Sequence, residues 1–422
     1  MQTTAPVLLP LANGLRVVVV PMQWRQTVSC SVFVRTGSLH ESRALNGISH
    51  VVEHMAFKGT QQRSCQRINL DAERVGAEVN AHTDRDHTAF HIDGLARDLP
   101  LFVELLADIV LHSSFPADEL ERERGVILQE LSEIEGDPEA MAYQLFDSAC
   151  YGQHAAGQPV IGRRATLKRV RRADLLDYVA RQYTACNVVV AASGPVDPET
   201  FARSVDMAFA GMPAGTPNVV DAPAWHGGLM LRRMAGSAQC HVVLGCSAPL
   251  LADDAHLEHV LAAALLGEGM SSPLLDELRE RRGLAYHAGC WADIQTQTGQ
   301  FVIEAATAPE QAEELLQAVH DLLTEQAARI DPVALGRARN QILVRGLRDL
   351  EHPARSLEAA AQDLFCRGRL RDPQALADRL QAVGDETLRG VFAQMLSGHA
   401  AAALAGSVPS KARARASTLF CL

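Results

Sequence analysis

The sequence contains no two cysteines in the C-x-x-C spacing that zinc ribbons and redox sites use. Its nine cysteines stand singly along 422 residues, and their number is odd. A disulfide framework is typical of short secreted chains with an even number of cysteines. We therefore expect reduced thiols, which are typical of a cytoplasmic protein.

An excess of positive charge and long apolar runs are also absent. Lys and Arg together number 39 against 50 Asp and Glu, which gives a formal net charge of -11. Nucleic-acid binding requires clustered basic residues, so we expect no nucleic-acid partner. No apolar run approaches the ~20 residues of a membrane span. The N-terminus lacks the basic-then-apolar pattern of a signal peptide. We expect a cytoplasmic protein without a membrane partner.

The hydrophobic fraction of 47% is that of an ordinary globular protein, and the length suggests two or three domains. Hydrophobic periodicity predicts the same order of elements in each half of the chain. The first half has strands at 15–20 and 28–36, helices at 44–57 and 66–75, a strand pair within 78–92, and helices at 99–111 and 118–134. The second half has strands at 229–233 and 240–246, helices at 255–266 and 273–281, strands at 285–291 and 299–306, and helices at 310–325 and 332–350.

Between the halves, Pro and Gly are dense enough to mark a linker. The breakers are Pro213, Gly215, Pro217, Pro223, Gly227 and Gly228. We predict an α+β protein of two similar domains in tandem, 1–213 and 229–422, joined by residues 214–228. Each domain is expected to be a mainly antiparallel sheet packed with helices.

The helix expected at 44–57 carries the pattern H-x-x-E-H. His50, Glu53 and His54 lie at positions i, i+3 and i+4, which share one face of a helix. Two imidazoles can then face one metal ion beside a carboxylate that handles a proton, and the order is that of the inverzincin peptidases. A lone helical histidine is more often structural than a ligand, and the five-residue pattern also arises by chance.

A catalytic zinc ion usually takes three protein ligands, so a third must come from elsewhere. The helix expected at 118–134 offers Glu123 and Glu130, seven residues apart on one face. The same helix holds several other acids, so spacing alone does not choose between them.

Four longer stretches carry a family resemblance. They are NGISHVVEHMAFKGT (46–60), VNAHT (79–83), ERERGVILQE (121–130) and, with Ser271 and Ser272 before it, LRERRGLAY (278–286). Together they resemble the pitrilysin (insulinase-like) zinc peptidases, and most of all the short branch that includes the mitochondrial processing peptidase. The resemblance spans essentially the whole chain.

This resemblance implies a role for each site residue. His50, His54 and Glu130 would bind Zn2+, and Glu123 would orient a ligand. Glu53 would be the general base that takes a proton from the attacking water.

The resemblance also assigns Arg279 and Tyr286 of the second domain to the substrate and the developing oxyanion. For Arg279, the alternative is a surface cation beside Arg281 and Arg282. Asn80 and Ala81 match an exposed edge strand on which an extended peptide pairs, and the alternative is an ordinary strand.

Pro273 departs from the family pattern, and a separate pair of histidines only partly matches a metal motif. Pro273 stands where relatives usually carry Arg; proline is tolerated in a first helical turn, so we expect the helix to form there. His256 and His259 occupy the place equivalent to the metal helix, but their spacing is one residue short. We interpret them as a solvated or relict helix face.

We therefore predict a zinc-dependent endopeptidase that hydrolyses peptides or unfolded and leader segments inside a chamber. The family further implies a homodimer, since chains of this length pair to enclose such a chamber. The alternative is a non-catalytic scaffold, as in relatives that form core proteins of the respiratory bc1 complex. The residues leave the natural substrate open.

Overall fold

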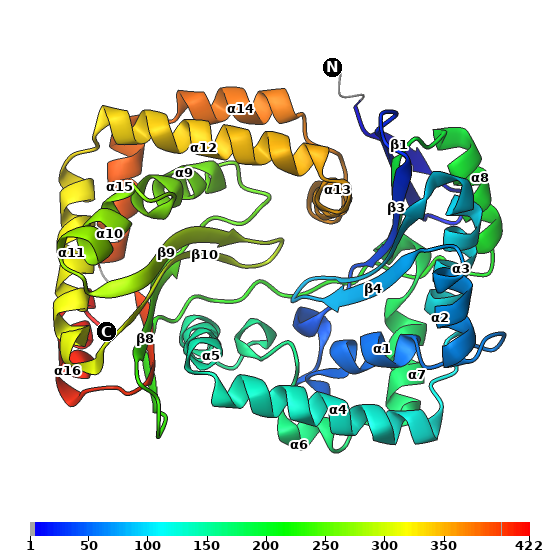
Figure 1. The fold of residues 1–422 in the computed structure, drawn as a ribbon, viewed down its shortest axis with the longest axis horizontal. Helices are drawn as coiled ribbons and strands as arrows, with labels where there is room; N and C mark the ends of the chain where they lie inside the picture. The colour runs from blue at the N-terminus through cyan, green and yellow to red at the C-terminus, as the bar shows by residue number, and fades with distance from the viewer. Residues whose placement is uncertain (1–4, 398) are drawn as a thin grey trace. The chain divides into compact units, whose positions relative to one another are not determined.

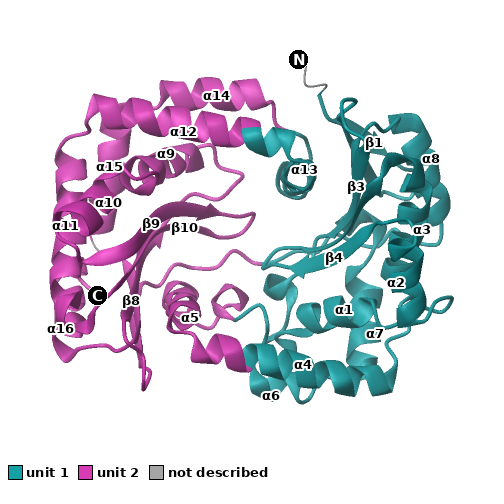
Figure 2. Ribbon diagram, viewed as in Figure 1, with its two compact units in different colours: residues 1–131, 159–220, 348–370 teal, residues 132–158, 221–347, 371–422 magenta. Residues whose placement is uncertain are grey.

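The computed structural model describes residues 5–397 and 399–422. The chain forms two compact units, each assembled from three segments (Figure 2). Unit 1 contains residues 1–131, 159–220 and 348–370, and unit 2 contains residues 132–158, 221–347 and 371–422.

Unit 1 is built on a six-stranded sheet with the order β1-β2-β6-β3-β5-β4 (Figure 1). Its strands are β1 (Val7–Pro10), β2 (Arg16–Pro21), β3 (Thr27–Val34), β4 (Glu78–Thr83), β5 (Thr88–Leu95) and β6 (Val188–Gly194). All neighbours are antiparallel except β2 and β6. The strands are rich in β-branched residues, which fit a pleated, buried surface.

Unit 1 also contains helices, several of which pack on the two faces of this sheet. They are α1 (Ile48–Ala56), α2 (Cys65–Glu73), α3 (Leu99–His112), α6 (Arg164–Leu167), α7 (Arg172–Gln182), α8 (Pro198–Ala208) and α13 (Pro353–Arg367), together with most of α4 (Ala117–Gly136). In Figure 1, α8 and α13 lie on opposite sides of the strands. α13 covers the face that carries Val18, Phe33 and Val189. The alternate residues Val17 and Val19 point the other way and are also fully buried.

Unit 2 has a five-stranded sheet with the order β7-β11-β8-β10-β9. Its strands are β7 (Gly228–Arg233), β8 (Cys240–Ser247), β9 (Ala285–Ile294), β10 (Gly299–Thr307) and β11 (Ala401–Gly406). Only the pair β7 and β11 is parallel. This order repeats β2-β6-β3-β5-β4 of unit 1 strand for strand, including the position of the parallel pair.

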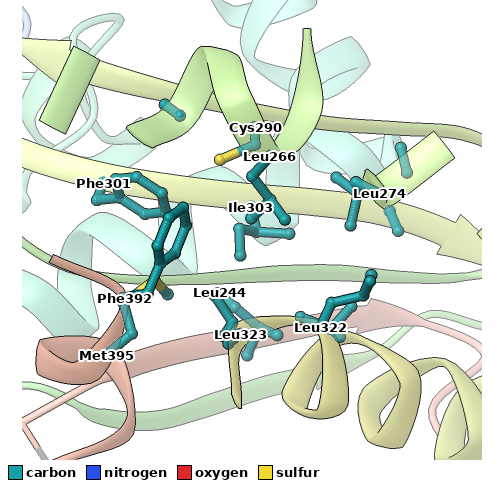
Figure 3. Packing of buried hydrophobic residues seen from close by; sticks show 14 of the residues in the cluster. Leu244, Leu266, Leu274, Cys290, Phe301, Ile303, Leu322, Leu323, Phe392 and Met395 are labelled. Carbon is teal, nitrogen blue, oxygen red and sulfur yellow. The ribbon is translucent and has the colours of Figure 1, made fainter. Parts of the chain in front are cut away.

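Unit 2 also contains helices, most of which enclose one large core. They are α5 (Pro138–Tyr151), α9 (His256–Gly267), α10 (Pro273–Leu275), η6 (Asp276–Arg281), α11 (Ala312–Ala328), α14 (Pro373–Ala382), α15 (Asp385–Leu396) and α16 (Ser410–Phe420), with most of α12 (Pro332–Glu351). Figure 3 shows Phe301 and Ile303 of β10 packed among Leu266, Leu323 and Phe392 from the helices. Burying each such side chain contributes about 1.5–3 kcal/mol.

One helix from each half of the chain packs in the unit built mainly from the other half. α5 lies against β7, β8 and β11, and α13 lies against β2, β3 and β6. Gly245 of β8 permits the first packing, because a Cβ there would lie 2.6 Å from the ring of Phe146 in α5. The compact units are therefore defined by spatial packing and not by position along the chain. The domain boundaries 1–213, 214–228 and 229–422 remain a prediction.

The predicted fold class is confirmed: the chain is α+β, with two tandem domains that each hold a mainly antiparallel sheet. The predicted elements are present, with bounds that differ by a few residues. For example, the helix expected at 44–57 begins only at Ile48, because Gly47 stands in the left-handed region with φ 95°. In the part of the chain that the structure describes, each helix is too short or too polar to serve as a membrane span.

Candidate metal centre and catalytic site

The start of α1 is fixed by close backbone packing and by a buried carboxylate. A Cβ at Gly47 would lie 2.7 Å from the Cα of Gly162, so only glycine fits this approach. Glu41 accepts hydrogen bonds from the backbone N–H groups of Gly47 at 2.7 Å and Ser49 at 2.8 Å. These contacts satisfy donors that a helix N-terminus otherwise leaves unpaired.

The two faces of α1 have different roles. Ile48, Val51, Val52 and Met55 are buried in the core of unit 1. The opposite face presents His50, Glu53 and His54, which are partly exposed. The sequence pattern thus anchors the helix on one side and leaves the metal-binding pattern accessible on the other.

A chain of charged hydrogen bonds orients His54. Lys58 Nζ lies 2.7 Å from Glu123 Oε1, and Glu123 Oε2 lies 3.1 Å from His54 Nδ1. Burial alone would raise the pKa of Glu123, but the hydrogen bonds from Lys58 and His54 lower it below the ordinary value. The ionised carboxylate holds the proton on Nδ1, which leaves the lone pair of His54 Nε2 available to a metal.

His50, His54 and Glu130 form a group whose ligand atoms lie within 4.8 Å of one another. Glu130 Oε2 lies 3.9 Å from His50 Nε2 and 3.7 Å from His54 Nε2. This oxygen is buried and has no hydrogen-bond donor among the described residues. A buried carboxylate oxygen without a donor is costly unless a cation satisfies it. The donor set, two imidazoles and a carboxylate, suits zinc, so these residues fit that ion.

Burial tunes the protonation of the site. It lowers the pKa of His50 to about 4, with a further contribution from the nearby His54. His50 is therefore neutral at pH 7 and can donate a lone pair. Burial raises the pKa of Glu53 above its ordinary value, while the hydrogen bond from Thr83 opposes the shift. Thr83 Oγ1 donates to Glu53 Oε2 at 2.6 Å, so Glu53 stands beside the metal-binding group without being part of it.

Asn80 and Ala81 lie on β4, the last strand of the unit 1 sheet. In the described part of the chain, β4 pairs with β5 alone, with Asn80 opposite His91 and Ala81 opposite Phe90. The other edge of β4 therefore has backbone groups that can pair with an added strand. Thr83, the last residue of β4, is the one that contacts Glu53.

Arg279 and Tyr286 lie together in unit 2. The Arg279 guanidinium stands over the Tyr286 ring at 4.8 Å from its centroid, and 81% of Tyr286 is exposed. Arg279 belongs to η6, a π-helical turn closed by the hydrogen bond from Arg282 N to Glu277 O at 3.2 Å. π-helical turns often occur at functional sites. Pro273 occupies the first position of α10, as expected.

For the second-half histidines, the solvated alternative is wrong and the relict alternative stays a prediction. His256 and His259 were expected on a solvated or relict helix face, but only 4% and 5% of them is exposed. They are buried because α9 packs against β9, β10 and α15 in unit 2. Neither residue belongs to a potential metal-binding group in the described part of the chain.

Sequence reasoning missed three residues that position the site, namely Glu41, Lys58 and Thr83. Two of them had a local signal. Lys58 follows His54 by four residues, at helical spacing, and Thr83 follows Ala81 by two residues, on the same face of β4. Glu41 had none, because only the fold brings it to the start of α1.

Comparison with known proteins now identifies the family. Residues 16–164 match the family described as insulinase (peptidase family M16), and residues 169–342 match the family described as peptidase M16 inactive domain. A Mycobacterium tuberculosis protein named as an uncharacterized zinc protease is 32% identical over 419 residues, covering 96% of this chain and 94% of that protein. The chain belongs to the M16 peptidase family.

Other M16 relatives agree in length and fold. A Bacillus subtilis protein, also named as an uncharacterized zinc protease, is 28% identical over 403 residues and is covered to 98%. The crystal structure of a protease from Helicobacter pylori matches with a TM-score of 0.86 at 23% identity, over 95% of this chain and 99% of that one. A Pseudomonas fluorescens structure described as a peptidase M16 inactive domain matches with a TM-score of 0.87 at 20% identity, over 96% of this chain and 98% of that one. These structures show the shared M16 fold.

Proposed function

We propose that this M16 protein is a zinc-dependent endopeptidase that hydrolyses peptides or unfolded and leader segments. The observation that carries the proposal is the convergence of His50, His54 and Glu130 within 4.8 Å, beside a separately held Glu53. If these residues had only a structural role, the buried Glu130 oxygen would be expected to accept a hydrogen bond, and it accepts none from the described residues.

His50, His54 and Glu130 would hold the zinc ion. When bound, zinc lowers the pKa of a coordinated water to about 7 and polarises a carbonyl. Glu53 Oε takes a proton from the attacking water and delivers it to the leaving amine. Thr83 holds this carboxylate in place, and Lys58 and Glu123 hold the His54 ring.

The substrate would pair with the free edge of β4 at Asn80 and Ala81. An added strand gains backbone hydrogen bonds that do not depend on sequence, which suits an enzyme of unfolded segments. Because Thr83 joins the end of β4 to Glu53, a peptide paired on this strand would run toward the general base.

We further propose that Arg279 and Tyr286 contact the substrate, the Tyr hydroxyl as an oxyanion donor. Their stacking at 4.8 Å supports a joint role over that of an isolated surface cation. The homodimer, the absence of nucleic-acid and membrane partners, and the cytoplasmic location remain predictions.

The test is cleavage of a mixed peptide library by the zinc-loaded protein, read by mass spectrometry, with Glu53→Gln as the matched blank. The proposal predicts new peptide termini with the wild type and none with the variant. A scaffold would leave the library intact with both proteins. Equal cleavage by both proteins would exclude this site as its source.

A further inference from the structure

A second group of potential metal ligands lies on the opposite face of β4 from the site described above. It comprises His82, His87 and Glu358, all in unit 1. Successive strand residues point to opposite faces, so Thr83 faces Glu53 while His82 faces the other way. His82 pairs across the sheet with Ala89, which packs against α13, the helix that carries Glu358.

The three ligand atoms have the spacing of a tetrahedral zinc site. His82 Nε2 lies 3.4 Å from His87 Nε2. Glu358 Oε1 lies 3.7 Å from His82 Nε2 and 3.4 Å from His87 Nε2. Two ligands bound tetrahedrally at the usual 2.0–2.1 Å stand about 3.4 Å apart, so one zinc ion fits the group with little movement.

His87 is held in the way that metal-binding histidines usually are. Its Nδ1 lies 2.8 Å from Asp86 Oδ1, and only 1% of the residue is exposed. A carboxylate on Nδ1 fixes the ring and leaves Nε2 for a metal. The side chains of His82 and Glu358 are 40% and 36% exposed, so an ion and a coordinated water can reach the group from solvent.

A metal-free arrangement competes with this one. Burial alone would lower the pKa of His87, but its hydrogen bonds with Asp86 and Glu358 raise it to about 10. Without a metal, the protonated ring therefore bridges the two carboxylates. A divalent cation must displace the proton on His87 Nε2. The cation then binds all three ligands, whereas the proton joins only His87 and Glu358.

We propose that His82, His87 and Glu358 form a second zinc site, which fastens α13 to the hairpin of β4 and β5. The site joins a helix from the C-terminal half to strands from the N-terminal half, within unit 1. Its role is structural, and it does not depend on the proposed peptidase activity.

The experiment uses the full chain, stripped with a chelator, reloaded with ZnCl2 alone and desalted before elemental analysis. Wild type is expected to keep about two zinc ions per chain, and His50→Ala and His87→Asn about one each. The double variant should keep none. His91→Asn is the matched control, because His91 touches the His82 ring but is not in the group; it should keep both ions.

Zinc loss in His87→Asn could also come from a folding defect, because His87 is buried. Glu358→Gln separates the two causes, because Glu358 is partly exposed. It should lose one ion while circular dichroism stays unchanged. In the His50→Ala background, zinc should raise the melting temperature, and Glu358→Gln should abolish that rise.

One zinc per wild-type chain, lost in His50→Ala and kept in His87→Asn, overturns the proposal and leaves the catalytic site intact. Zinc lost in His87→Asn but kept in Glu358→Gln also overturns it, since the ion would then lie with Asp84 and Asp86. If His87→Asn and Glu358→Gln lost zinc while His50→Ala kept the wild-type zinc content, the result would support this site and exclude zinc binding at the catalytic one.

Discussion

At the scale of single residues, the carboxylate of Glu123 links the lysine side chain of Lys58 to His54. Glu123→Gln removes the negative charge that holds the proton on His54 Nδ1. We expect zinc affinity at the catalytic group to fall about 10–100-fold, since such outer hydrogen bonds typically matter to that extent. Competition with a fluorescent zinc chelator measures the change.

The matched control for this experiment is Glu121→Gln on the same helix. The Glu121 side chain is 70% exposed and pairs with Arg124 away from the histidines. Its zinc affinity should equal that of the wild type. An equal loss in both variants would mean that the net charge of α4, and not the orientation of His54, controls binding.

Thr83 offers a second residue-scale prediction. Thr83→Val keeps the shape of the side chain but removes the hydrogen bond to Glu53. Hydrogen bonds to charged groups contribute about 1.5–3 kcal/mol, so we expect kcat to fall about tenfold or more. KM and zinc content should stay unchanged, and Thr83→Ser should restore kcat because it keeps the hydroxyl. A general loss of stability would instead lower all of these together.

At the scale of elements, α1 depends on Glu41 for its first turn. Burial raises the pKa of Glu41 to about 7 from its ordinary 4.5, although hydrogen bonds from Ser49 and Gly47 oppose the shift. An acid whose folded pKa is raised stabilises the fold most below pH 4.5, and this contribution is lost as the pH rises through 7. Glu41→Gln does not titrate.

The free energy of unfolding of the wild type, relative to Glu41→Gln, should therefore decrease between pH 5 and pH 8. The decrease is at most about 3 kcal/mol. Urea denaturation at both pH values measures it. A difference that stayed constant from pH 5 to pH 8 would mean that the helix N-terminus and its N–H donors keep Glu41 ionised throughout.

The sequence predicted some elements and missed others for physical reasons. β2 and β3 were predictable because Val-rich runs fill both faces of a strand. β6 and β11 were not assigned: β11 reads Ala401–Gly406 and is mostly alanine, which favours helix when judged locally. The packing of α5 and α13 depends on contacts between residues far apart in the sequence, which periodicity does not report.

The candidate site shows the same division. The spacing of His50, Glu53 and His54 predicted a shared helix face. The acidic residues of α4 predicted that this helix provides the third zinc ligand. Spacing could not distinguish Glu123 from Glu130, since both lie on one face. In the structure, Glu130 approaches both imidazole Nε2 atoms while Glu123 bonds Nδ1 of His54. The group of His82, His87 and Glu358 could not be predicted from the sequence, because Glu358 lies about 270 residues from the two histidines.

At the scale of the whole molecule, residues of unit 2 should contribute to turnover although the proposed zinc ligands lie in unit 1. Tyr286→Phe should lower kcat about 10²–10³-fold, the usual cost of an oxyanion donor. Arg279→Ala should lower kcat/KM through weaker substrate capture. Steady-state kinetics on one fluorogenic peptide measure both, with Arg281→Ala as the control at an exposed neighbour.

In each of these variants, zinc content and melting temperature should match the wild type, because neither residue is a ligand or part of a core. Wild-type kcat/KM in both variants, with zinc intact, would show that Arg279 and Tyr286 form only a surface pair.

In the proposed mechanism, metal binding and proton transfer belong to different residues of α1. The most direct measurement is zinc content and peptide cleavage in parallel for Glu53→Gln and His50→Ala. We predict that Glu53→Gln binds as much zinc as the wild type and cleaves nothing, since the proposed role of Glu53 is proton transfer and not zinc binding. His50→Ala should lose both catalytic zinc and cleavage. Near-wild-type turnover by Glu53→Gln would exclude Glu53 as the general base, and full zinc content in an inactive His50→Ala would exclude His50 as a zinc ligand.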